Sequence, residues 1–114
     1  MKPKKVVFFN QELENAFNSL SEKDPIKKAI IRAIKNIQED AFAGRNVRKE
    51  LISKSLIMKY GINNLWIYNL PSTWRLLYSI TSDGEIEIIA AILDWMNYKD
   101  YEDYLNFSGI CALC

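Results

Sequence analysis

The sequence contains no histidine, and its two cysteines, Cys111 and Cys114, stand in the last four residues. Without an imidazole, the chain cannot itself supply the base of a serine triad or the histidine ligands of most zinc hydrolase sites. A single C-x-x-C pair cannot complete a four-ligand zinc site, and a redox pair normally opens a helix beside a strand. We therefore expect no metal and no cofactor, and interpret CALC as a loose or packed tail that can form a disulfide within or between chains.

Long apolar runs are also missing. The longest uncharged apolar runs, residues 6–9 and 88–93, fall far short of the roughly 20 residues that a membrane span needs, and the first is too short for a signal-peptide core. A chain of 114 residues with 49% hydrophobic and 25% charged residues suits a single globular domain. We expect one domain over residues 1–114, with 109–114 as the loose tail, in a cytoplasmic protein that has no membrane partner.

Charge is nearly balanced overall, at +1, but it is unevenly distributed, because residues 1–64 carry +6 and residues 65–114 carry −5. This asymmetry predicts either a basic face for phosphates or two solvated faces that happen to differ. Residues 45–64 supply much of the positive charge, as Arg45, Arg48, Lys49, Lys54 and Lys59.

The first half of the chain has a strand-helix-helix pattern. Residues 6–9 predict a strand, and Asn10 can cap a helix over about residues 11–20. Asp24 before Pro25 predicts the start of a second helix, which Gly44 can end in a left-handed conformation. An apolar stripe runs along this second helix, and its basic residues lie off the stripe, where we expect them to be solvated: Lys27, Lys28, Arg32 and Lys35.

The second half predicts a meander of strands at residues 65–69, 74–81 and 85–93, with turns at 70–73 and 82–84. The last strand is the most apolar and should lie near the sheet's centre. Asn97 can cap a short C-terminal helix. Residues 45–64 are ambiguous, since 55–60 fit either a helical turn or an irregular strand. The expected fold is α+β: an N-terminal strand and an antiparallel helical hairpin packed on a small, mainly antiparallel sheet.

Strand alternation sets Arg75 apart from its neighbours. Trp74, Leu76 and Tyr78 share one side of their strand and should face the helical hairpin, so Arg75 points to the other side. We expect that other side to be a polar sheet face without helices, available to a partner. The alternative is an ordinary surface ion pair between Arg75 and a carboxylate of the next strand, Glu85, Glu87 or Asp94.

The stretches GINNLWIYNLPSTWRLLYSI and EIEIIAAILDWMNYKDYEDYL, with the order of elements, resemble the RelE/ParE superfamily of type II toxin-antitoxin toxins, and within it an archaeal RelE-like group. The local pattern spans residues 51–107. The resemblance implies a toxin that enters the ribosome and cuts mRNA without a metal, inhibiting translation until a cognate antitoxin protein wraps it. The ParE branch keeps the fold but inhibits DNA gyrase, so the resemblance bears more directly on fold than on activity.

The same resemblance suggests roles for individual residues. Arg75 matches the arginine that contacts the scissile phosphate, Tyr101 matches a C-terminal aromatic near the cut site, and Lys99 would add charge. Further phosphate or base contacts would come from Arg48, Lys49, Lys54, Lys59, Tyr68 and Tyr98. Where some relatives have strand lysines this chain has Trp66 and Tyr68, and Asn97 stands where related sequences often have histidine.

These departures keep a second interpretation open. The chain can instead be a RelE/ParE-fold binding protein without nuclease activity, such as a gyrase inhibitor, a decayed toxin or a regulatory partner. A homodimer contact through the acidic C-terminal part is a further alternative; it would use Tyr98, Tyr101, Tyr104 and Leu105.

Overall fold

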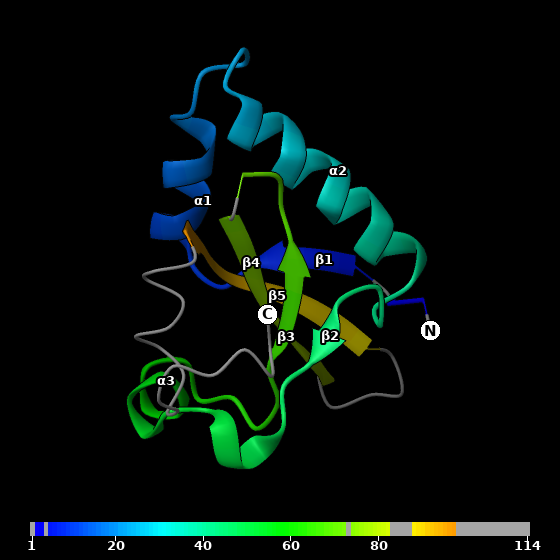
Figure 1. Ribbon diagram of the computed structural model, residues 1–114, viewed down its shortest axis with the longest axis vertical. Coiled ribbons are helices and arrows are strands. Elements are labelled where there is room, and N and C mark those ends of the chain that lie inside the picture. Colours follow the sequence, from blue (N-terminus) through cyan, green and yellow to red (C-terminus); the bar gives the residue numbers. More distant parts are fainter. Residues whose placement is uncertain (1, 4, 73, 83–87, 98–114) are drawn as a thin grey trace.

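The computed structural model describes residues 2–3, 5–72, 74–82 and 88–97 (Figure 1). These residues form an α+β fold, as predicted. The elements in chain order are β1 (Lys5–Phe8), α1 (Gln11–Asn18), α2 (Pro25–Glu39), β2 (Arg45–Asn46), a 3₁₀ turn (Lys49–Leu51), α3 (Lys54–Tyr60), β3 (Trp66–Asn69), β4 (Trp74–Ser82) and β5 (Ile88–Asn97).

Each helix begins at a side-chain cap. Asn10 accepts a 2.8 Å hydrogen bond from the amide of Leu13, and Asp24 accepts one of the same length from the amide of Ile26, so both predicted caps are confirmed. Ser53 caps α3 in the same way, which resolves the ambiguous stretch as a helix. That helix ends at Gly61, whose φ of 63° is the left-handed conformation that glycine adopts without strain.

The end of α2 differs from the prediction. The helix stops at Glu39, with Asp40 in an extended conformation, and Gly44 lies beyond a turn. Gly44 is required by space: a Cβ there would lie 2.6 Å from the carbonyl oxygen of Ile67 and 2.9 Å from the hydroxyl of Tyr78. The glycine therefore allows the loop to approach β3 and β4 closely.

Lys27 also departs from the expectation that the basic residues of α2 are solvated. It is buried; its Nζ donates to Oε1 of Glu22 at 2.6 Å and to the carbonyl oxygen of Leu20 at 3.2 Å. The ammonium lies 5.3 Å from the centre of the Phe17 ring. The stem of Lys27 thus packs between α1 and α2 while the charge is satisfied at the connection between them.

Within the described residues, the sheet has five strands in the order β1-β5-β4-β3-β2. β1 pairs in parallel with β5, and the other pairs are antiparallel, so the predicted meander is confirmed. β5 lies next to the central strand β4, near the sheet's centre as expected. Asn97, expected to cap a helix, is the last residue of β5 and pairs with Trp74. The predicted C-terminal helix lies outside the described residues.

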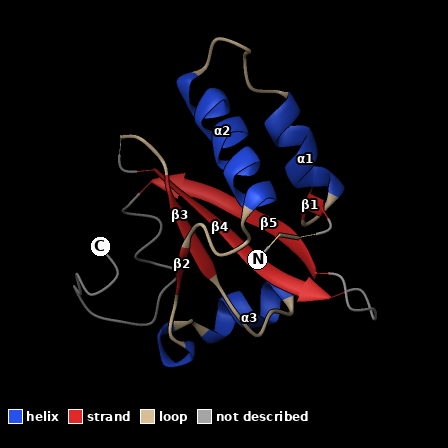
Figure 2. Ribbon diagram, turned by 90° about the vertical axis from the view of Figure 1, so that its right-hand side faces the viewer, coloured by secondary structure: helices blue, strands red, loops and turns tan. Residues whose placement is uncertain are grey.

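Among the described residues, one apolar core lies on each face of the sheet (Figure 2). On one face α1 and α2 pack on Leu76 and Tyr78. On the other, residues 47–65 with α3 pack on Ile67 and Leu77. The expectation that this second face carries no helix is therefore wrong. The segment brings its own apolar residues, Val47, Ile52, Leu56 and Leu65, and these need the sheet to be buried.

Candidate nucleic-acid interface

Arg75 lies on the α3 face of the sheet, where strand alternation predicts it. It is half-buried near the start of β4, two residues from the fully buried Leu77. One terminal nitrogen, Nη1, donates a 3.0 Å hydrogen bond to the carbonyl oxygen of Trp74. The central strand therefore holds a guanidinium at the margin of an apolar core, where charge interactions are less screened than on an open surface.

Arg45 of β2 shares this face. It pairs with Ile67, which pairs with Leu77, and cross-strand partners point to the same side of a sheet. Its Nη2 lies 3.5 Å from Oδ1 of Asn69, and Asn69 pairs with Arg75. Two arginines thus flank one asparagine across three strands. Sequence reasoning counted Arg45 only as part of the local charge, because a two-residue strand is too short for alternation to reveal its direction.

The predicted basic residues of the linker belong to the same layer. Arg48, Lys49, Lys54 and Lys59 are all exposed on the segment that packs over the α3 face. Nε of Arg48 lies 3.7 Å from Oε1 of Glu50, but both side chains are mostly solvated, so this ion pair adds little stability. Lys59 lies 5.2 Å from the centre of the Tyr60 ring. Arg75 and these cations therefore all lie on the α3 side of the sheet.

Tyr68 lies on the opposite face from Arg75. It pairs with Leu76, and its hydroxyl accepts a 2.5 Å hydrogen bond from Nδ2 of Asn36 in α2. Trp66 follows the same alternation and stacks on Phe42 with ring centres 5.0 Å apart. The structure thus places Tyr68 against the helical hairpin and does not bring it to Arg75. Tyr98, Lys99 and Tyr101 lie outside the described residues.

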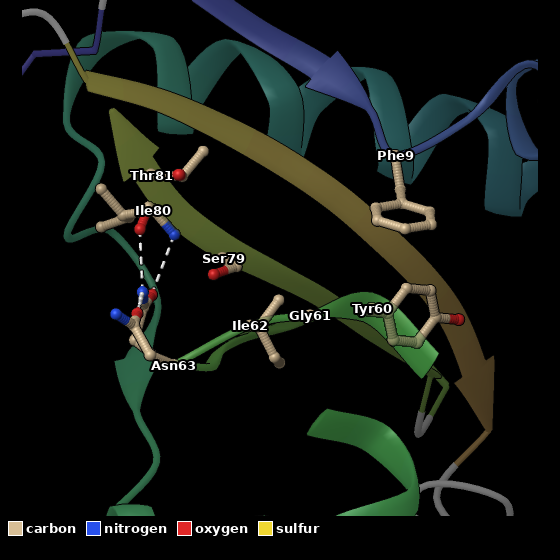
Figure 3. Close-up of a pocket in the computed structure, with 9 residues that line it drawn as sticks. Phe9, Tyr60, Gly61, Ile62, Asn63, Ser79, Ile80 and Thr81 are labelled. Atoms are coloured by element: carbon tan, nitrogen blue, oxygen red, sulfur yellow. Dashed lines mark hydrogen bonds between the residues drawn. The ribbon is translucent and has the colours of Figure 1, made fainter. Parts of the chain in front are cut away.

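A cleft of about 240 Å³ opens farther along the same face (Figure 3). Phe9 and Tyr60 form one end of it, with ring centres 4.8 Å apart and planes nearly perpendicular. Ser79 of β4 lines it, as does the loop between α3 and β3. In that loop the amide side chain of Asn64 bonds both backbone groups of Ile80, at 2.8 and 2.9 Å, so this wall of the cleft is fixed to the sheet. Sequence reasoning did not find this cleft, because its walls come from three distant segments.

Residue types limit the chemistry that the described part of the chain offers. Among the described residues there is no cluster of three metal-ligating side chains, and no helix there is long and apolar enough to cross a membrane. What the α3 face offers is guanidinium and ammonium groups beside a partly aromatic cleft. Such groups suit phosphate and base contacts.

Comparisons with known proteins add no family assignment. No family model matches the chain, and searches of curated proteins and of solved structures also found no match.

Proposed function

We propose that this protein is a RelE-like toxin that binds mRNA on the α3 face and cuts it in the ribosome. One observation carries the proposal: Arg75, the residue that the resemblance assigns to the scissile phosphate, lies on one sheet face with Arg45 and with Asn69 between them. A pair of guanidiniums can hold the oxygens of one phosphate or of two successive phosphates.

The proposed reaction is an internal transfer at phosphorus. The 2′-oxygen of the RNA attacks the adjacent phosphorus and gives its proton to a base, while the bond to the 5′-oxygen breaks and that oxygen takes a proton from an acid. The products are a 2′,3′-cyclic phosphate and a 5′-hydroxyl. Arg75 would stabilise the extra negative charge of the pentacoordinate phosphorus. Following the resemblance, Tyr101 would orient the base or leaving group, and Lys99 would add positive charge.

The proposal includes the partners that the resemblance implies. The ribosome would present the mRNA, and a cognate antitoxin would wrap the toxin and silence it. Both would meet the protein in the cytoplasm, where translation takes place. The exposed cations of residues 48–59 would contact phosphates of mRNA or ribosomal RNA, and this contact would weaken with added salt.

The test is to induce the protein in growing cells and to map RNA ends by sequencing. We expect growth arrest and new mRNA breaks that disappear when initiation of translation is blocked. Arg75→Ala should abolish both, and Arg75→Lys should restore little, because an ammonium lacks the planar fork. Arg32→Ala is the matched control, since Arg32 is exposed on α2 over the other face of the sheet. Breaks that persist in Arg75→Ala would contradict the assignment of the site.

A second function is favoured by a different observation. The chain has no histidine, and Trp66 and Tyr68, at positions where some relatives have lysines, face the helical hairpin. These positions supply no acid, base or charge beside Arg75. A binding protein that inhibits gyrase, or that regulates another protein, needs none of these groups. Growth arrest without RNA breaks, or gyrase inhibition by the purified protein, would select this alternative.

A further inference from the structure

The cleft near Phe9 combines apolar walls with a small number of polar groups, as ligand sites commonly do. Figure 3 shows the Phe9 and Tyr60 rings at one end and Ile62 along one side. Asn63, from the loop between α3 and β3, lies at the other end. Phe9 keeps 39% of its surface exposed although it is a large apolar residue. An exposed ring at the mouth of a cleft is available for stacking on a bound ring.

Ser79 supplies a polar group with unused bonding capacity. The residue is only 4% exposed and lines the cleft. Within the part of the chain that the structure describes, its hydroxyl makes no hydrogen bond. Because Ser79 lines the cleft, its hydroxyl is within reach of a hydrogen-bond donor or acceptor on a bound ligand.

Size restricts the ligand. At about 240 Å³ the cleft is smaller than the roughly 300 Å³ at which sites for drug-sized molecules begin. One heterocycle fits this space better than a complete nucleotide with its sugar and phosphate. The two aromatic rings favour a planar ligand, and the serine hydroxyl favours one with a hydrogen-bonding edge, which it can meet as donor or acceptor.

The position of the cleft relative to Arg75 indicates which molecule supplies this heterocycle. Arg75 and Ser79 stand four residues apart on the same side of β4, about 13 Å along the strand at ~3.3 Å per residue. We propose that the cleft binds one unstacked base of the RNA strand whose phosphates lie at Arg75 and Arg45. The base stacks on Phe9 or Tyr60 and hydrogen-bonds to Ser79. This inference rests on the proposed function, because it takes the RNA as the ligand of the α3 face.

The test uses two kinds of probe on the full chain, nucleosides and a sugar phosphate without a base, and follows their binding by backbone NMR. Adenosine, guanosine, cytidine and uridine are titrated separately, and ribose 5-phosphate serves as the probe that lacks a base. We expect at least one nucleoside to shift the amides of Ser79 and Ile62, and ribose 5-phosphate to leave them unchanged. Ser79→Ala should weaken nucleoside binding about fivefold, the usual effect of one neutral hydrogen bond.

Two further variants sharpen the result. Phe9→Ala should weaken binding by about 5-fold to 150-fold, the range for removal of a stacking ring, and it should leave the fold intact because Phe9 is at the surface. Ser55→Ala removes an exposed hydroxyl at the other end of α3 and should change nothing. A short oligonucleotide should bind more tightly than any nucleoside and should lose affinity in both Ser79→Ala and Arg75→Ala, which a site for free nucleosides would not show.

The outcomes separate the two proposals. If no nucleoside shifts Ser79, or if Ser79→Ala and Phe9→Ala bind as the wild type does, the base site is overturned, even where mRNA breaks depend on Arg75. If nucleosides and the oligonucleotide bind as expected but induction yields no mRNA breaks, the proposed base site is supported and the proposed nuclease activity is overturned.

Discussion

The hydroxyl of Tyr78 donates a 2.6 Å hydrogen bond to the carbonyl oxygen of Ala41 and accepts one of 2.9 Å from the amide of Gly44. Tyr78 is fully buried in β4, whereas Ala41 and Gly44 belong to the turn between α2 and β2. One side chain therefore fixes the loop that delivers Arg45 to the sheet.

The first prediction concerns this hydroxyl. Tyr78→Phe should lower the free energy of unfolding by about 1–3 kcal/mol, because the buried carbonyl of Ala41 loses its partner. Urea unfolding followed by far-UV circular dichroism measures the change. Tyr68→Phe is the matched control and should cost less, since the hydroxyl of Tyr68 meets the exposed Asn36 and water can replace that bond. Equal losses of stability in the two variants would contradict the role of the Tyr78 hydroxyl in fixing the loop between α2 and β2.

Alkaline pH gives an independent test of the same group. Burial raises the pKa of Tyr78 from 10.0 to about 12, and the hydrogen bond from Gly44 opposes that rise. Below pH 10 both states keep the proton; between pH 10 and 12 only the unfolded chain loses it, so stability falls as pH rises through this window. The loss from Tyr78 is on the order of 2 kcal/mol. It should be absent in Tyr78→Phe, so the stability difference between the two proteins should shrink as the pH rises.

Gly44 should tolerate no side chain. Gly44→Ala places a Cβ 2.6 Å from the backbone oxygen of Ile67, a group that cannot swing away, and should cost about 1–3 kcal/mol. Gly61→Asn is the contrasting variant, since Gly61 has a φ of 63° but open space around it, and asparagine tolerates that conformation. Thermal unfolding of the two variants separates them. A Gly44→Ala protein as stable as Gly61→Asn would show that the loop moves freely.

The side chain of Asn64 hydrogen-bonds to the backbone of Ile80 in β4, in the place where another strand would pair. Asn64→Ala removes the two bonds to the backbone of Ile80 and should destabilise the protein by about 1–2 kcal/mol. Hydrogen exchange at the amide of Ile80 should accelerate, because that amide loses its acceptor. Asn63→Ala, which removes only an exposed contact to Asn64, should stay within about 0.5 kcal/mol of the wild type. An unchanged exchange rate at Ile80 in Asn64→Ala would contradict the role.

Local patterns predicted those parts of the fold that depend on local physics. The caps Asn10 and Asp24, the apolar stripe of α2 and the alternation of β4 each act within a few residues, and each was correct. The left-handed cap predicted at Gly44 failed, since the close approach to Ile67 and Tyr78 depends on strands far along the chain. The second core escaped prediction for the same reason.

The candidate site divides in the same way. Alternation alone put Arg75 on the correct face, but two residues of β2 could not reveal that Arg45 joins it. The register between β3 and β4 decides that Asn69 is opposite Arg75, and that Tyr68 points away from it. Turn residues in the sequence do not specify such a register without the geometry of the hairpin.

The last prediction tests Arg45 as the second phosphate ligand. Arg45→Ala should weaken binding of a short single-stranded RNA about tenfold or more, the usual effect of removing a charged hydrogen-bond donor. The slope of log affinity against log salt should fall by about 0.7 for each phosphate that the variant no longer binds. Arg32→Ala should change neither quantity, because Arg32 lies over the opposite face. Asn69→Ala removes the neighbour of Arg45 without removing charge, so it should weaken binding while leaving the salt slope as it was. A salt slope unchanged in Arg45→Ala would show that Arg45 meets no phosphate, whatever the role of Arg75.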